Sequence, residues 1–195
     1  MIAGGIVAIA SFVPNTASAS TAMDTGGYTS QPIGHYEFCK RNPSECNQRN
    51  RRALPVRLTK SAWNTISGVN RLINERIQPM NDFDIYGKDE VWNFPIDVGD
   101  CEDYVLLKRK ILIQKGISPA NLLITVVRKK DGEGHAVLTV RTSRGDFILD
   151  NLRNNVKHWN RTGYRYLKRQ AETHTGRWVT IRGSRRIVKS SLYEQ

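Results

Sequence analysis

The chain has 195 residues, of which 30 are lysine or arginine and 18 are aspartate or glutamate, so its formal charge is +12. Its content of 39% hydrophobic and 25% charged residues is typical of a globular protein and excludes collagen-like and largely disordered chains. A chain of this length can bury a substantial core without a metal or many disulfides. The positive charge makes nucleic acid, anionic membrane and acidic glycan the partner classes to consider first.

The N-terminus has the features of an export signal. The first 19 residues contain no charged side chain, and an apolar run over residues 2–13 precedes Pro14 and Ala17-Ser18-Ala19. This pattern is typical of the hydrophobic region and cleavage site of a secretory signal peptide, although the usual basic N-terminal region is missing. A buried or disordered apolar N-terminus is the alternative. The run is too short for an ordinary membrane span, and we predict no transmembrane segment in the mature chain.

The predicted organisation follows from that signal. Residues 1–19 are the expected signal peptide, and residues 20–31, rich in serine, threonine and glycine, are an expected flexible segment. Residues 32–195 then form a single domain. We expect this domain in the periplasm or outside the cell, and the sequence contains no signal from which an oligomeric state could be predicted.

The chain contains three cysteines. Cys39 and Cys46 bracket a short polar segment, and in an oxidising compartment such a pair can close a local disulfide. Half of a zinc site is the alternative, but the sequence has no matching second pair of ligands. Cys101 is then the odd thiol, and an odd thiol in an exported protein requires a reason.

Two helices are predicted in the first part of the domain. Residues 54–78 carry apolar side chains at spacings of three to five, which predicts an amphipathic helix that begins near Thr59 or Ser61 and ends at Pro79. Residues 80–98 are loop-like and rich in aromatic side chains. A second helix is expected from Cys101 to about residue 114, with Gly116 as its C-terminal stop. Its broad apolar face indicates a central position.

The hydrophobic period then changes from that of a helix to that of a strand. Residues 122–128, 135–141 and 146–152 are predicted strands, joined by turns at Asp131-Gly132 and Arg144-Gly145, and residues 178–181 form a further short strand. The order of helices followed by an antiparallel meander predicts an α+β fold. In this fold the central helix, with Cys101 at its start, packs on an antiparallel sheet.

Three residues on these elements could form a catalytic unit. Cys101 lies in the first turn of the central helix, where free backbone N–H groups and the helix dipole favour a thiolate and can hold an oxyanion. His135 opens one predicted strand and Asp150 ends the next, so a hairpin would bring them together. Taken singly, each has an ordinary structural explanation: a small buried residue, a structural histidine and a turn aspartate.

Three short motifs carry a resemblance to a known family. Gly-Asp-Cys-Glu-Asp-Tyr at residues 99–104, Gly-His-Ala-Val-Leu at 134–138 and Leu-Asp-Asn at 149–151 resemble the bacterial transglutaminase-like cysteine peptidases, which include the LapG-type periplasmic proteases. The resemblance runs from about residue 32 to 182. It implies a papain-like or transglutaminase-like α+β fold, a Cys101-His135-Asp150 triad, and cleavage of a secreted or surface-anchored protein, such as an adhesin, through a thioester.

The resemblance also implies a calcium ion beside the nucleophile, held by the acidic residues Asp100 and Glu102. No organic cofactor is expected. Hard oxygen ligands of the kind that calcium prefers cluster in this part of the sequence: Asp82, Asp84, Asp89, Glu90, Asp97, Asp100, Glu102 and Asp103. The alternative is that Asp100 caps the helix while Glu102 and Asp103 complement its dipole.

Two other functions stay open. The same thioester could be resolved by a lysine amine, which would make the protein a transglutaminase. The protein could also be a non-catalytic module that binds an anionic envelope partner through basic clusters at Arg49, Arg51, Arg52, Arg57 and Lys60 and at Arg182, Arg185, Arg186 and Lys189. An exported location and the absence of a zinc-finger or RRM-type motif argue against nucleic acid.

The charge is unevenly distributed along the chain. Residues 82–103 contain the eight acids named above and one base, Lys88, which gives this segment a local charge of −7. An acidic surround raises the pKa of a thiol and opposes the effect of the helix dipole on Cys101. A bound cation, or a substrate that carries positive charge, would relieve this conflict.

Overall fold

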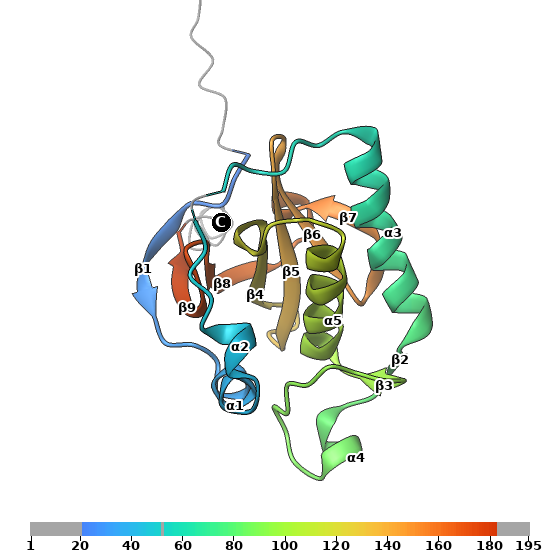
Figure 1. The fold of residues 1–195 in the computed structure, drawn as a ribbon. Helices are drawn as coiled ribbons and strands as arrows, with labels where there is room; N and C mark the ends of the chain where they lie inside the picture. The colour runs from blue at the N-terminus through green and yellow to red at the C-terminus, as the bar shows by residue number, and fades with distance from the viewer. Residues whose placement is uncertain (1–20, 52, 183–195) are drawn as a thin grey trace, which may run out of the picture.

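An antiparallel sheet of seven strands forms the centre of this computed structural model, which describes residues 21–51 and 53–182 (Figure 1). The strands lie in the spatial order β1-β9-β8-β4-β5-β6-β7. The predicted signal peptide and the basic residues Arg52, Arg185, Arg186 and Lys189 fall outside the described residues. The strand bounds are β1 Thr25–Thr29, β4 Leu122–Arg128, β5 Gly134–Thr142, β6 Gly145–Asp150, β7 Arg153–His158, β8 Arg165–Ala171 and β9 His174–Ile181.

Two long helices cover one face of the sheet (Figure 1). Helix α3 (Lys60–Arg76) begins where the Thr59 side chain accepts a hydrogen bond from the Ala62 N–H, and it buries Ile66, Val69 and Ile73. Its start agrees with the predicted one, and it ends one helical turn before Pro79. Apolar residues three and four apart share one helix face, which explains why this stripe turns toward the core.

Helix α5 (Cys101–Gln114) packs between α3 and the strands β4 and β5. Its bounds are those predicted from the sequence. The backbone leaves the helix through Gly116, whose φ of +89° lies in the left-handed region that favours glycine. The helix buries Tyr104, Val105, Leu106 and Leu112 in the main core, so its predicted central position is confirmed.

A smaller core cluster lies on the opposite face of the sheet. In β5 the main core contains Ala136 and Leu138, whereas Val137 belongs to the smaller cluster, as the alternation of side chains along a strand requires. Tyr166 of β8 and the partly buried Tyr164 also pack in this second cluster. The sheet is therefore covered on both faces, which explains the almost continuous apolar sequence of β4.

The remaining elements are short. They are the helices α1 (Ile33–Arg41), α2 (Pro43–Cys46) and α4 (Asp82–Tyr86), the 3-10 turns η1 (Pro119–Asn121) and η2 (Trp159–Arg161), and the parallel strand pair β2 (Gln78–Pro79) and β3 (Val98–Gly99). Residues 80–98, predicted as a loop, are mostly irregular but include α4. The β2–β3 pair joins the end of α3 to the residues just before Cys101.

Strand β1, at Thr25–Thr29, lies inside the segment 20–31 that was predicted to be flexible. Strand β1 pairs antiparallel with β9 through Thr25 and Ile181, Tyr28 and Val179, and Thr29 and Trp178. Backbone hydrogen bonds to a neighbouring strand hold this segment, and a composition rich in serine, threonine and glycine gives no sign of them. Strands β7 and β8 were also not predicted.

The hairpin between β5 and β6 turns at Gly145. The φ of this glycine is +102°, and a Cβ atom there would lie 2.3 Å from the backbone oxygen of Thr21. Only glycine fits both the conformation and the close approach. The pairing of Thr142 with Gly145 and of Leu138 with Leu149 fixes the register that carries His135 and Asp150 toward the same end of the hairpin.

Candidate active site

Cys101 begins helix α5 and lines a pocket together with His135. The backbone N–H of Ala136 donates a hydrogen bond to the Cys101 Sγ at 3.3 Å. This contact joins the start of the helix to the start of β5. The thiol in turn donates to the Glu102 carboxylate, with Sγ and Oε2 3.0 Å apart.

His135 and Asp150 form a buried pair. The His135 Nε2 atom lies 2.9 Å from the Asp150 Oδ1, and each side chain is only 5% exposed. Because Nε2 is engaged with Asp150, Nδ1 is the ring nitrogen that remains for a proton from Cys101. The structure thus brings together the predicted pair from β5 and β6. Cys101 accepts its hydrogen bond from Ala136, the residue that follows His135.

The Asp150 carboxylate accepts hydrogen bonds on both oxygens. The Leu152 N–H donates to Oδ1 at 3.0 Å, alongside His135, and the Tyr164 hydroxyl donates to Oδ2 at 2.6 Å. Burial alone would raise the pKa of Asp150, but the hydrogen bond and charge interaction with His135, together with the bonds from Tyr164 and Leu152, lower it below its usual value. Asp150 is therefore a carboxylate at neutral pH.

Carboxylates dominate the pocket around Cys101. Burial raises the pKa of the Cys101 thiol well above its ordinary value, and the negative charge of Glu102 raises it further. The hydrogen bond from Ala136 acts in the opposite direction. The acidic residues that line the pocket with Cys101 are Asp82, Asp84, Asp89, Glu90, Asp100, Glu102 and Glu133. The conflict between an acidic surround and a thiolate, expected from the sequence, is therefore present in the structure.

Three carboxylates converge next to the start of α5. One oxygen each of Asp82, Asp100 and Asp103 lie within 4.8 Å of one another. Each of these residues has a buried carboxylate oxygen without a hydrogen-bond partner among the described residues. Burial raises the pKa of Asp82 to about 6 and that of Asp103 to about 7. Three carboxylates brought together in this way, each with an unpaired buried oxygen, fit a divalent cation such as calcium.

The two predicted metal ligands occupy different positions in this arrangement. Asp100 belongs to the group of three carboxylates and also lies beside Glu102 and Cys101, whereas Glu102 contacts the thiol. Burial and the neighbouring Asp100 both raise the pKa of Glu102. Asp100 is the N-cap residue of α5, but within the described residues its side chain makes no capping hydrogen bond; Glu102 and Asp103 lie in the first turn, as the dipole alternative expects. Asp82 and Asp103 were predicted only as members of an acidic segment.

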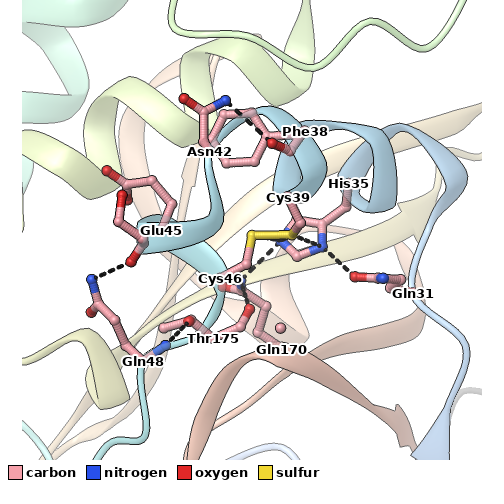
Figure 2. The surroundings of a disulfide bond; sticks show 12 residues. Gln31, His35, Phe38, Cys39, Asn42, Glu45, Cys46, Gln48, Gln170 and Thr175 are labelled. Carbon is pink, nitrogen blue, oxygen red and sulfur yellow. Dashed lines mark hydrogen bonds between the residues drawn. A yellow bond between two sulfur atoms is a disulfide. The ribbon is translucent and has the colours of Figure 1, made fainter.

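The other two cysteines form a disulfide, Cys39–Cys46, that connects α1 to α2 (Figure 2). The buried His35 lies beside it, with Nδ1 3.5 Å from the Cys39 Sγ and 2.8 Å from the Gln31 Oε1. Burial, and to a smaller degree the charge of Arg109, lowers the pKa of His35 to about 3. With its sulfurs bonded to each other, this group of a histidine and two cysteines is a structural cross-link.

Across the described part of the chain, no helix is both long and apolar enough to cross a membrane.

Comparison with known proteins gives one family. The model of the bacterial transglutaminase-like cysteine proteinases (BTLCP) matches residues 25–186. No curated protein matches the chain. The fold is similar to solved structures of Legionella pneumophila LapG. The calcium-bound form has 24% identity and a TM-score of 0.48, covering 54% of this chain and 62% of that one. The EGTA-treated form has 25% identity and a TM-score of 0.47, covering 54% and 61%. The chain spans about three fifths of the length of the LapG chains.

Proposed function

Since the chain belongs to the family of bacterial transglutaminase-like cysteine proteinases, we propose that it is a cysteine endopeptidase with Cys101, His135 and Asp150 as its catalytic residues. The observation that carries this proposal is the buried 2.9 Å contact between His135 and Asp150, at the pocket that Cys101 lines. A nucleophile, a base and a group that orients the base are the minimum set for acyl transfer.

The reaction begins with a proton transfer. His135 takes the Cys101 proton at Nδ1, and the thiolate attacks the carbonyl carbon of a peptide bond. The negative charge that develops on the carbonyl oxygen is stabilised by the backbone N–H of Cys101 at the start of α5. His135 then gives its proton to the leaving amine, and a thioester remains. Water, deprotonated by His135, attacks the thioester and releases the acid product and the thiol, while Asp150 holds the imidazole throughout.

The proposed substrate is a secreted or surface-anchored protein, for example an adhesin, in the periplasm or outside the cell. The signal peptide expected over residues 1–19 supports this location. The family resemblance supports the substrate class. The acidic pocket further favours substrate segments that carry positive charge near the cleaved bond.

The test of this function is a comparison of the wild-type protein with Cys101→Ala. Each is incubated with a library of peptides, and mass spectrometry identifies new peptide ends. We expect cleavage by the wild type and none by the variant, because Cys101 supplies the nucleophile. Isopeptide cross-links between glutamine and lysine in place of new ends would identify a transglutaminase. Unchanged cleavage by Cys101→Ala would exclude the proposed mechanism.

We also propose that the converging carboxylates of Asp82, Asp100 and Asp103 bind calcium, with Glu102 adjacent. Calcium, when bound, supplies positive charge that compensates these carboxylates and relieves their effect on the pKa of Cys101. The convergence of the three carboxylates, and the unpaired buried oxygen that each has among the described residues, support a cation at this place. The carboxylates then stay ionised at neutral pH, and the thiol ionises more readily.

Calcium should therefore stabilise the protein as well as activate it. At one hundred times its dissociation constant, a ligand that binds only the folded state adds about 2.7 kcal/mol. We expect a higher melting temperature with calcium than with EGTA, and faster alkylation of Cys101 by iodoacetamide. Asp103→Asn should weaken calcium binding about tenfold or more in calorimetry. Asp84→Asn, an exposed carboxylate of the same pocket, is the matched control. Equal melting temperatures with calcium and EGTA would refute the site.

A further inference from the structure

Tyr164 contacts both partners of the buried His135–Asp150 pair. Its hydroxyl donates to the Asp150 Oδ2 at 2.6 Å, and its ring stands edge-on to the His135 ring, with centroids 5.6 Å apart and an interplanar angle of 66°. We propose that Tyr164 is a positioning residue that holds Asp150 and His135 in the orientation needed for proton transfer. This inference rests on the proposed function.

Tyr164 reaches the pair from the side of the sheet opposite to α5. It follows η2 and precedes β8, and it packs against the smaller core cluster. The preceding Gly163 has a φ of +78°, a left-handed conformation that turns the chain at this point. The Arg153 guanidinium lies over the Tyr164 ring, 5.7 Å from its centroid. The ring is thus held between a core cluster, an imidazole and a cation.

The hydrogen bonds around Asp150 show what the hydroxyl contributes. His135 and the Leu152 N–H both bind Oδ1, so Oδ2 depends on Tyr164. Rotation of the carboxylate would break contacts on both oxygens at once. With the hydroxyl removed, Oδ2 loses its donor and the carboxylate can turn, carrying Nε2 of His135 with it. A hydrogen bond to a charged group is among the stronger hydrogen bonds of a protein, so its loss should be measurable.

The ring contributes a second constraint. An imidazole that passes a proton from Cys101 to the leaving amine must keep Nδ1 directed at the pocket, because small angular errors reduce the rate. Edge-to-face contact with Tyr164 limits the tilt of His135 about its bond to Asp150. Burial, the hydrogen bond to Asp150 and the charge of Asp150 raise the pKa of Tyr164, so its hydroxyl keeps its proton and remains a donor at neutral pH.

The test compares two tyrosines that lie close together. Tyr164→Phe removes the hydroxyl that binds Asp150 but keeps the ring. Tyr166→Phe removes a buried hydroxyl that binds Thr162 and the backbone oxygen of Trp159 instead. With a peptide that the wild type cleaves, we expect kcat to fall about tenfold or more in Tyr164→Phe with KM nearly unchanged. Tyr166→Phe should keep the kcat of the wild type.

A second measurement does not depend on activity. The proton on the His135 Nε2, held against a buried carboxylate, should give a strongly deshielded NMR signal, assigned by its loss in His135→Gln. We expect this signal to shift or broaden in Tyr164→Phe and to remain in Tyr166→Phe. An unchanged signal and unchanged kcat in Tyr164→Phe would overturn the inference. A wild type that cleaves no peptide would overturn the proposed function, and the NMR comparison would then decide the role of Tyr164 by itself.

Discussion

Lys108 lies on α5, the helix that begins with Cys101, and is fully buried. Its Nζ has no hydrogen-bond partner among the described residues and lies 5.5 Å from the centroid of the Tyr104 ring. Burial lowers the pKa of Lys108 to about 7, although the charge of Asp150 acts in the opposite direction. A buried amine without a hydrogen bond destabilises the folded protein whenever it carries a proton.

The free energy of unfolding should therefore depend on the protonation of Lys108. Between pH 7 and about 10.5 Lys108 holds a proton in the unfolded chain that it has lost in the folded chain, so the contribution of this residue to stability rises with pH, by at most about 1.4 kcal/mol per unit. Below pH 7 the lysine is charged in both states and the penalty is complete. At pH 7, Lys108→Met should unfold at a higher urea concentration than the wild type, with a free energy of unfolding larger by on the order of 1 kcal/mol. The variant should also lack the part of the increase in stability between pH 7 and 10.5 that comes from Lys108.

The control for this prediction is Lys110→Met, an exposed lysine two residues along the same helix. It removes the same charge without relieving a buried one, so its urea midpoint at pH 7 should stay close to that of the wild type. Lower stability of Lys108→Met at pH 7, or a stability difference between Lys108→Met and the wild type that stays constant between pH 7 and 10, would show that the buried amine already has a compensating partner.

At the scale of elements, the central helix and the following hairpin could be predicted because their signals are local. Helix α5 has a polar residue at its start, an apolar face and a glycine at its end. The strands β4, β5 and β6 are apolar segments separated by Asp131-Gly132 and Arg144-Gly145. The proximity of His135 and Asp150 could be predicted from the same hairpin. The family match and the antiparallel sheet covered by helices confirm the predicted α+β fold.

The strands that were missed depend on contacts with distant segments. Strand β7 is an edge strand with mostly exposed polar side chains, and β8 carries Arg165, Lys168 and Arg169. Neither alternates clearly between apolar and polar residues, so pairing with β6, β4 and β9 decides their structure. Tyr164 could not be distinguished for the same reason, because its contact with Asp150 exists only once β8 has joined the sheet.

Across the whole molecule, the net charge of +12 hides a separation of charge. The pocket around Cys101 is lined by the seven carboxylates given above and by one lysine, Lys129, which pairs with Glu133 at 2.6 Å. Asp84, Asp89 and Glu90 stay exposed at this pocket. A charged substrate therefore approaches a negatively charged pocket on a protein whose net charge is positive. The net charge acts on the substrate at long range and the pocket carboxylates act at short range, with opposite signs.

This opposition predicts a specific salt dependence of cleavage. Two peptides that share one cleaved sequence, but carry lysines or glutamates beside it, would be compared by kcat/KM at several salt concentrations. At low salt we expect the lysine peptide to be cleaved about tenfold faster, because the exposed carboxylates line the same pocket as Cys101 and salt screens their charge little when the Debye length is about 10 Å or more. The ratio should approach one at high salt. It should also fall in Asp84→Asn with Asp89→Asn, but not in Glu75→Gln, an exposed acid on α3. Faster cleavage of the glutamate peptide at low salt would mean that the net positive charge of the protein, and not the pocket carboxylates, determines which substrates associate faster.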